Sequence, residues 1–193
     1  MRGLIILAAL VGMAGSAKAF DIDYAAVMDA NAAKVEELGD RHRQLILPGP
    51  VRIMEYSDGA GGANFIGIDE SANGSAGCMF KLLVDLSAGQ RLCDTMLTPD
   101  EAANLDAALL RSARFVAANT VPPVPEADIK ERLAAMVDRV VAGYRAKGMS
   151  CPGDQGFDPQ AVALAKNAAT PRFADIQALM HAEPRLPVPN PCM

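Results

Sequence analysis

The sequence contains no tryptophan and few other aromatic residues. Three tyrosines and six phenylalanines make up 5% of its 193 residues. Proteins that bind sugars or single-stranded nucleic acids by stacking present several aromatic rings to the ligand. The composition therefore argues against a stacking platform of either kind.

Histidine is equally scarce, and the common catalytic and metal-binding motifs are absent. The only histidines are His42 and His181, and neither lies in an HExxH zinc motif. The sequence also lacks a GxSxG nucleophile elbow, an EF-hand loop and a CxxC pair. We therefore assign no catalytic residue, no metal ligand and no cofactor. If folding assembles a hydrolase site, His42 is the candidate general base.

The first nineteen residues have the three parts of a secretory signal peptide. Arg2 provides positive charge, residues 4–11 form a short apolar run, and residues 17–19 fit the A-x-A cleavage pattern. The run is too short to span a bilayer as a helix, which needs ~20 residues. No later run is long and apolar enough to stop transfer. The sequence thus predicts cleavage before Phe20 and release of a single mature domain, residues 20–193.

Loss of this leader makes the chain more acidic. The full sequence carries 18 Lys and Arg residues against 23 Asp and Glu. Because Arg2 and Lys18 leave with the leader, 16 basic residues remain against 23 acidic ones, a formal charge of −7. Nucleic acids and anionic membranes are bound largely through Lys and Arg clusters. We therefore expect neither a nucleic acid nor an anionic membrane as a partner. We also expect that the mature protein does not span a membrane.

All four cysteines follow the leader, and an even number in an exported chain predicts two disulfides. Four cysteines permit three pairings, and the sequence alone does not choose among them. We expect Cys78–Cys93, at the two ends of one predicted strand-and-turn segment. The second bridge would then be Cys151–Cys192, which would hold the C-terminal tail.

The first half of the mature chain predicts a helix and a small antiparallel sheet. Apolar residues recur with loose helical spacing over residues 20–39. Short apolar runs bounded by Gly, Pro, Asn, Asp and Ser then predict strands at 44–47, 51–56, 64–69 and 78–86.

The second half predicts helices with clear start signals. Thr98 and Glu101 form a capping box with Pro99 at the first helical position, and this helix should end near Asn119, before a run of prolines. Further helices are predicted at 126–147, 159–168 and 171–182. The expected fold class is α+β: an N-terminal helix, a sheet of three or four strands, a cluster of about four helices, and an extended proline-rich tail at 184–193.

A glycine-rich segment between two predicted strands is the candidate contact loop. It contains Asp58, Gly59, Gly61, Gly62 and Asn64. The Lys-Ser/Thr pair of a phosphate-binding loop is missing, and the segment leads into a predicted strand instead of a helix. We expect a flexible hairpin loop, a place where scaffolds often carry binding residues.

Together these observations favour an exported accessory or binding protein without catalytic activity, such as a subunit of an envelope complex or an inhibitor of a secreted enzyme. Its partner would be another envelope protein, contacted through the glycine-rich loop or the tail. The alanine-rich composition, with more arginine than lysine, is typical of bacterial proteins from GC-rich genomes, so the expected compartment is the periplasm, with the extracellular space as the alternative. The alternative is a small periplasmic hydrolase whose site is assembled only in the fold.

Overall fold

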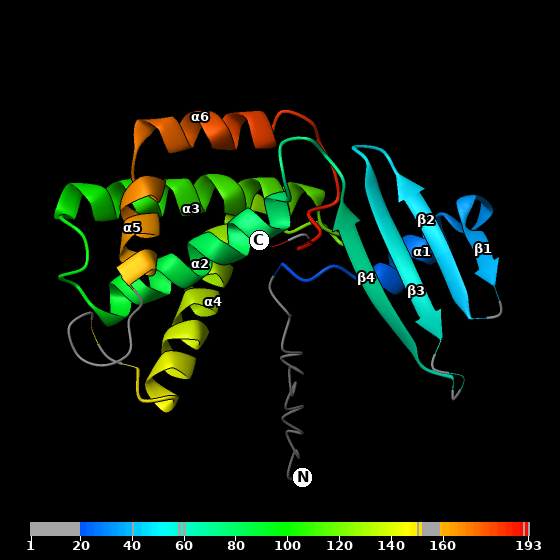
Figure 1. Cartoon of the computed structure of the whole chain (residues 1–193), viewed down its shortest axis with the longest axis horizontal. Helices are drawn as coiled ribbons and strands as arrows, with labels where there is room; N and C mark the ends of the chain where they lie inside the picture. Colours follow the sequence, from blue (N-terminus) through cyan, green and yellow to red (C-terminus); the bar gives the residue numbers. More distant parts are fainter. Residues whose placement is uncertain are drawn as a thin grey trace, which may run out of the picture.

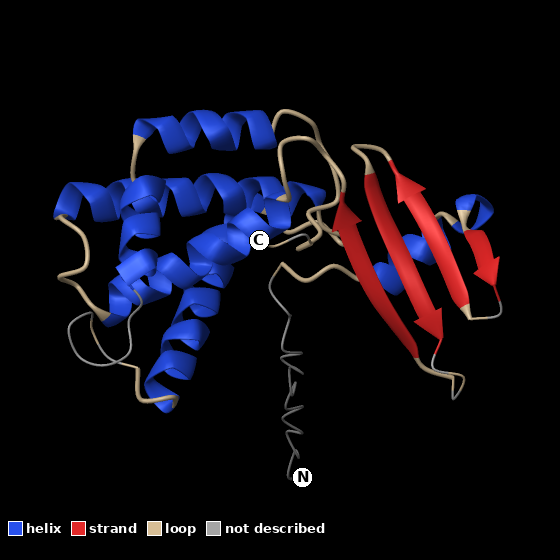
Figure 2. Ribbon diagram, in the orientation of Figure 1, coloured by secondary structure: helices blue, strands red, loops and turns tan. Residues whose placement is uncertain are grey.

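A four-stranded sheet stands beside a group of helices in the computed structural model (Figure 1). The structure describes residues 20–39, 41–57, 59, 61–149, 151, 159–190 and 192. The predicted signal peptide, residues 1–19, lies outside these ranges. The strands follow one another along the chain and most helices come after them (Figure 2), so the predicted α+β class is confirmed.

The sheet is an antiparallel meander in the order β1-β2-β3-β4. Its strands are β1 (Glu36–Gly39), β2 (His42–Leu47), β3 (Val51–Ser57) and β4 (Ala63–Asp69). Helix α1 (Tyr24–Ala30) packs on one face, where its Val27 and Met28 join the apolar cluster around Ile53. Three of the four predicted strands and the antiparallel arrangement are therefore confirmed.

The first predicted helix is much shorter than expected. Asn31 ends α1 because its backbone N–H and its side-chain amide both donate to carbonyls of the last turn, the side chain to Val27. A short 3-10 helix, η1 (Ala32–Lys34), follows, and the chain then enters β1. The prediction of helix up to residue 39 was wrong because pairing with β2 overrides the loose helical spacing of this segment.

Residues 78–86, predicted as a strand, lie in helix α2 (Ala76–Leu92). Ser75 caps this helix, and its hydroxyl accepts a hydrogen bond from the Cys78 N–H at 3.0 Å. Buried residues occur on most sides of α2 because it packs against α3, α4 and α5. A nearly continuous apolar run of this kind does not distinguish a buried strand from a buried helix.

The helices of the second half are confirmed. They are α3 (Pro99–Asn119), α4 (Glu126–Ala146), α5 (Pro159–Ala168) and α6 (Pro171–Met180). The predicted capping box is formed in full, since Thr98 accepts from the Glu101 N–H while the Glu101 carboxylate accepts from the Thr98 N–H at 2.8 Å. These bonds lower the pKa of Glu101.

Apolar side chains form two separate cores. The larger lies among the helices and includes Leu83, Leu105 and Val137. The smaller lies between α1 and the sheet, and it includes Leu186 and Val188 of the C-terminal tail. The tail is therefore part of the folded core.

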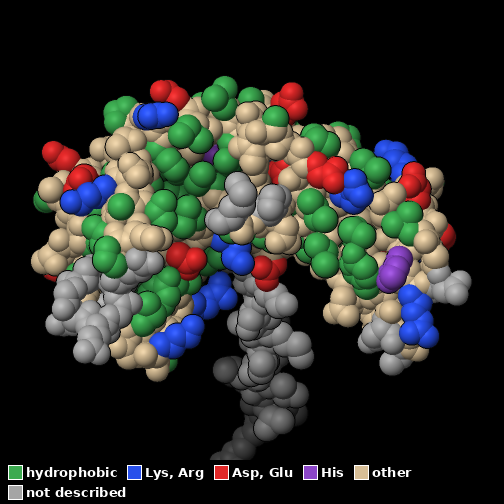
Figure 3. All heavy atoms as spheres, in the orientation of Figure 1, with side chains coloured by type: hydrophobic (Ala, Val, Ile, Leu, Met, Phe, Trp, Pro, Cys, Tyr) green, Lys and Arg blue, Asp and Glu red, His purple; other side chains and the backbone are tan. Residues whose placement is uncertain are grey.

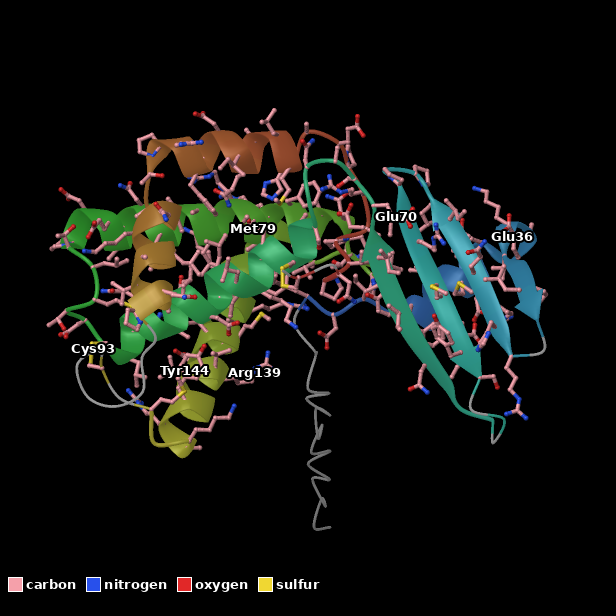
Figure 4. All side chains as sticks on the ribbon, viewed as in Figure 1. Glu36, Glu70, Met79, Cys93, Arg139 and Tyr144 are labelled. Atoms are coloured by element: carbon pink, nitrogen blue, oxygen red, sulfur yellow. A yellow bond between two sulfur atoms is a disulfide. The ribbon has the colours of Figure 1, made fainter. Side chains whose placement is uncertain are left out.

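The two disulfides join partners other than those expected. They are Cys78–Cys192 and Cys93–Cys151, each with a Cα–Cα distance of 5.1 Å. The expected Cys78–Cys93 bridge is wrong because the two residues lie at opposite ends of α2, ~22 Å apart at the rise of an α-helix. A disulfide spans at most ~7 Å between Cα atoms. Figure 4 shows Cys93 at the end of α2 that lies far from the sheet.

The tail passes between the sheet and the N-terminus of α2. The Val188 carbonyl accepts a hydrogen bond of 2.6 Å from the buried Ser75 hydroxyl. Neighbouring Gly77 lets the Pro187 backbone lie directly on the helix, since a Cβ built on Gly77 would overlap the Pro187 carbonyl oxygen. Farther along, Asn190 forms a parallel bridge with Ile68 of β4. The tail thus contacts both halves of the structure.

A buried ion pair fixes the start of the tail. Arg185 Nε lies 2.8 Å from Asp69 Oδ2, and the two side chains are 3% and 0% exposed. The same guanidinium donates to the carbonyls of Met180 at 2.7 Å and Gly74 at 3.0 Å. It therefore joins the end of β4, the loop before α2 and the end of α6.

We predict opposite effects for alanine at two helical glycines. Gly77→Ala should lower the free energy of unfolding by at least ~2 kcal/mol, because the added methyl group displaces the tail backbone. Gly143→Ala in α4 is the matched control. No atom lies within 4 Å of its added Cβ, so it should raise that free energy by ~0.5–1 kcal/mol through helix propensity alone. Urea unfolding measures both, and equal effects would contradict the tight contact at Gly77.

Candidate functional site

A cleft of about 720 Å³ separates the helices from the sheet. Figure 3 shows the surface hollowed between these two halves. One wall comes from α2, α3 and α4, the other from β4 and α1, and the tail contributes two prolines. The lining residues are Phe20, Asp21, Ile22, Asp23, Tyr24, Ala25, Phe65, Gly77, Phe80, Lys81, Val116, Met136, Pro187 and Pro189.

Aromatic rings occur in pairs on both sides of the cleft. Phe20 meets Phe80 of α2 edge to face, with ring centroids 5.1 Å apart. Tyr24 of α1 stacks on Phe65 of β4 at 6.1 Å. Burial raises the pKa of Tyr24 to about 12, so its hydroxyl keeps its proton at neutral pH. The cleft is therefore an apolar surface with a phenol at one wall, a composition typical of binding sites.

Charged groups of both signs stand in the cleft. Asp23 caps α1 by accepting from the Ala26 N–H at 3.0 Å. Asp21 and Lys81 are exposed, and neither makes a salt bridge within the part of the chain that the structure describes. Lys81 interacts electrostatically with the Asp85 carboxylate of the same helix. The cleft thus offers a bound molecule a negative charge at Asp21 and a positive charge at Lys81.

The predicted contact loop lies outside this cleft. Gly59, Gly61 and Gly62 belong to the turn between β3 and β4, and Asn64 pairs with Tyr56 within the sheet. Gly59 and Gly61 have φ values of 76° and 90°, which glycine adopts at little cost. Asp58 lies outside the described residues. The turn is at the end of β4 remote from the tail (Figure 1), so the two predicted contact elements are not neighbours, and a contact role for the loop stays a prediction.

His42 is the first residue of β2 and is exposed. Strand pairing places it opposite Tyr56, and their rings meet edge to face at 4.9 Å. Its nearest ring neighbour is thus a phenol, and His42 does not line the cleft. Arg43, beside it, pairs with Glu55 across the strands.

His181 follows the last residue of α6, close to its predicted place. Its ring stacks on Phe115 at 4.5 Å, and its Nε2 atom is buried without a hydrogen-bond partner among the described residues. Burial, together with the positive charges of Arg185 and Arg111, lowers the pKa of His181 to about 4. The ring is therefore neutral at pH 7, and it stacks on α3 and does not line the cleft.

Other kinds of site find little support in the described part of the chain. Across residues 20–192, leaving aside the positions not described, no three His, Cys, Asp or Glu side chains gather as metal ligands would. None of the helices described is long and apolar enough to cross a membrane. Comparison with known protein families, curated proteins and solved structures found no match to this chain.

Sequence reasoning missed the cleft because its walls come from distant segments. Tyr24, Phe65 and Phe80 are separated by many residues, and only the fold brings them to one hollow. Lys81 was hidden within a segment read as a strand. The one available signal was the tail, whose prolines and Cys192 predicted an extended segment fixed to the rest of the protein.

We predict that His181 makes the protein less stable in acid. Its folded pKa is about 4, below the ordinary value of 6.5, so the unfolded chain takes up a proton first as the pH falls. The contribution of the neutral ring is complete above pH 6.5 and is lost toward pH 4. Because solvent screens the half-buried ring, the loss should be on the order of 1–2 kcal/mol, measured by urea unfolding at about pH 7 and about pH 4.5.

Two substitutions separate the contribution of His181 from any other loss of stability that the protein shows in acid. His181→Phe keeps a ring on Phe115 but cannot titrate, so it should show a smaller loss of stability on acidification. His42→Phe, at the exposed end of the sheet, is the matched control and should retain the full loss. Equal losses in both variants would contradict the role of His181.

Proposed function

We propose that the mature protein is an exported, non-catalytic binding or accessory protein of the cell envelope, and that the cleft is its contact surface. The observation that carries the proposal is the cleft itself. It is large enough for a peptide or small ligand, its walls carry paired aromatic rings, and the exposed charges of Asp21 and Lys81 stand in it. Apolar pockets with a few polar groups are the usual form of a binding site.

Export is supported by the two disulfides, since such bridges persist mainly in oxidising compartments. The conformation of Phe20 is compatible with removal of the signal peptide at the predicted cleavage point. Phe20 has a φ of 63°, which is unfavourable for a bulky residue, while its ring is buried against Phe80. Cleavage before Phe20 would remove this torsion and leave the buried ring in place.

The hydrolase alternative has less support. Such an enzyme would need a base beside a nucleophile or an acid, with hydrogen bonds to orient it. His42 is exposed next to Tyr56, outside the cleft, and His181 is half-buried against Phe115 of α3. The carboxylates of the cleft, Asp21 and Asp23, therefore have no histidine beside them in the lining. This geometry favours binding over acid–base catalysis.

The proposed partner is another envelope protein. A single contact cleft would serve equally well in a subunit of an envelope complex and in an inhibitor of a secreted enzyme. The acidic balance of the chain argues against nucleic acid. Because both tail and N-terminus take part in the fold around the cleft, a terminal affinity tag would disturb the surface under test. A probe placed within the cleft avoids this problem.

We predict that a partner is captured from inside the cleft in the native cell envelope. The photoreactive residue p-benzoylphenylalanine in place of Lys81 should form a specific cross-link to one protein. The same residue in place of Lys130, which is exposed on α4 and does not line the cleft, is the matched control and should not. Cross-links at neither position, or the same cross-links at both, would contradict the cleft as the contact surface.

A further inference from the structure

The two edges of the sheet are protected very differently. Edge strand β1 has only four residues, includes Glu36 and Glu37, and shifts register between Glu37 and Gly39. Short length, charge and irregularity are the usual means of preventing an edge from pairing with another chain. Figure 4 shows Glu36 at this edge, on the side of the sheet remote from α2. Edge strand β4 has seven residues in regular register, with no Lys, Arg or Pro.

The tail covers only one end of the β4 edge. The Asp69 N–H donates to the Asn190 carbonyl at 2.7 Å, and the Gly67 carbonyl accepts from the Asn190 side chain at 3.2 Å. Backbone groups that face away from β3 occur at every second residue of β4. Like those of Gly67 and Asp69, the N–H and C=O groups of Ala63 and Phe65 therefore point away from β3. These groups have no hydrogen-bond partner among the described residues.

This free edge faces the cleft. Phe65 is part of the lining, and Phe80, Lys81 and Met136 stand on the opposite wall. Figure 1 shows β4 as the strand nearest the helices, with β1 at the far side of the sheet. A second copy of this protein could not pair through the same edge, because its own helices flank its β4 in the same way. A single extended strand is the occupant that fits.

We propose that the cleft binds an extended segment of a partner protein, which pairs as an additional strand with β4 at Ala63 and Phe65. The proposal rests on the proposed function of the cleft and names its occupant. Alternate side chains of an added strand would face the aromatic wall, so they should be apolar. Asp21 and Asp23 favour a Lys or Arg in the segment, as does the acidic balance of the whole chain.

Selection from a random peptide library displayed on phage supplies the probe. The target is the processed protein purified from the periplasm of an expression host. Enriched peptides should have apolar residues at alternate positions and at least one basic residue. Failure to enrich such peptides would overturn the proposal.

Backbone methylation then tests strand pairing directly. Only every second amide of an added strand faces β4, so N-methylation of one alternating set of amides in a selected synthetic peptide should weaken binding about tenfold at each position, the effect of one lost hydrogen bond. Methylation of the other set should have little effect. Equal tolerance at all positions would overturn strand addition.

Variants of the protein test the hydrogen bonds that β4 would contribute to the added strand. Ala63→Pro removes the outward N–H at the first residue of β4, where proline fits a strand, and should weaken peptide binding about tenfold. Ala63→Ser keeps the N–H and should bind normally. If these tests fail while the cross-link from position 81 persists, strand addition is wrong and the cleft remains a contact surface. If the cross-link from position 81 is absent as well, the proposed function of the cleft as a contact surface is also wrong.

Discussion

The buried ion pair between Arg185 and Asp69 is the interaction on which the rest of the structure depends. Removing two charges from water is costly, and attraction between them compensates only when their other bonding groups are satisfied. Here Arg185 also donates to the carbonyls of Met180, Gly74 and Glu183, while Asp69 Oδ1 accepts from the Ser71 N–H at 2.9 Å. This network forms only when the sheet, the helices and the tail are all in place.

The position of the tail determines the form of the candidate site. Beyond Arg185, the tail fills the space between β4 and α2 and ends in the bridge from Cys192 to Cys78. It satisfies the β4 edge near Asp69 and contributes Pro187 and Pro189 to the cleft. The remainder of the edge is left open within the hollow. One segment thus joins the two halves and defines which part of the sheet can accept a partner.

Local signals predicted the fold better than they predicted the site. The capping box at Thr98 and the turns around β3 need only neighbouring residues, and both were confirmed. Helix α2 was read as a strand because it is buried on most sides, and the disulfide pairing followed that error. The cleft and the ion pair depend on residues more than a hundred positions apart, such as Asp69 and Arg185. No pattern within a short window identifies such partners.

A double-mutant cycle on the ion pair is the most direct test of this account. Asp69→Leu and Arg185→Met should each lower the free energy of unfolding by ~3–5 kcal/mol, because each leaves a buried charge without its partner. The double variant should lose much less than the sum, since no unpaired charge remains. Urea unfolding of the four proteins gives the coupling. Additive effects, or single losses below ~0.5 kcal/mol, would show that the tail is held by its disulfide and apolar contacts alone.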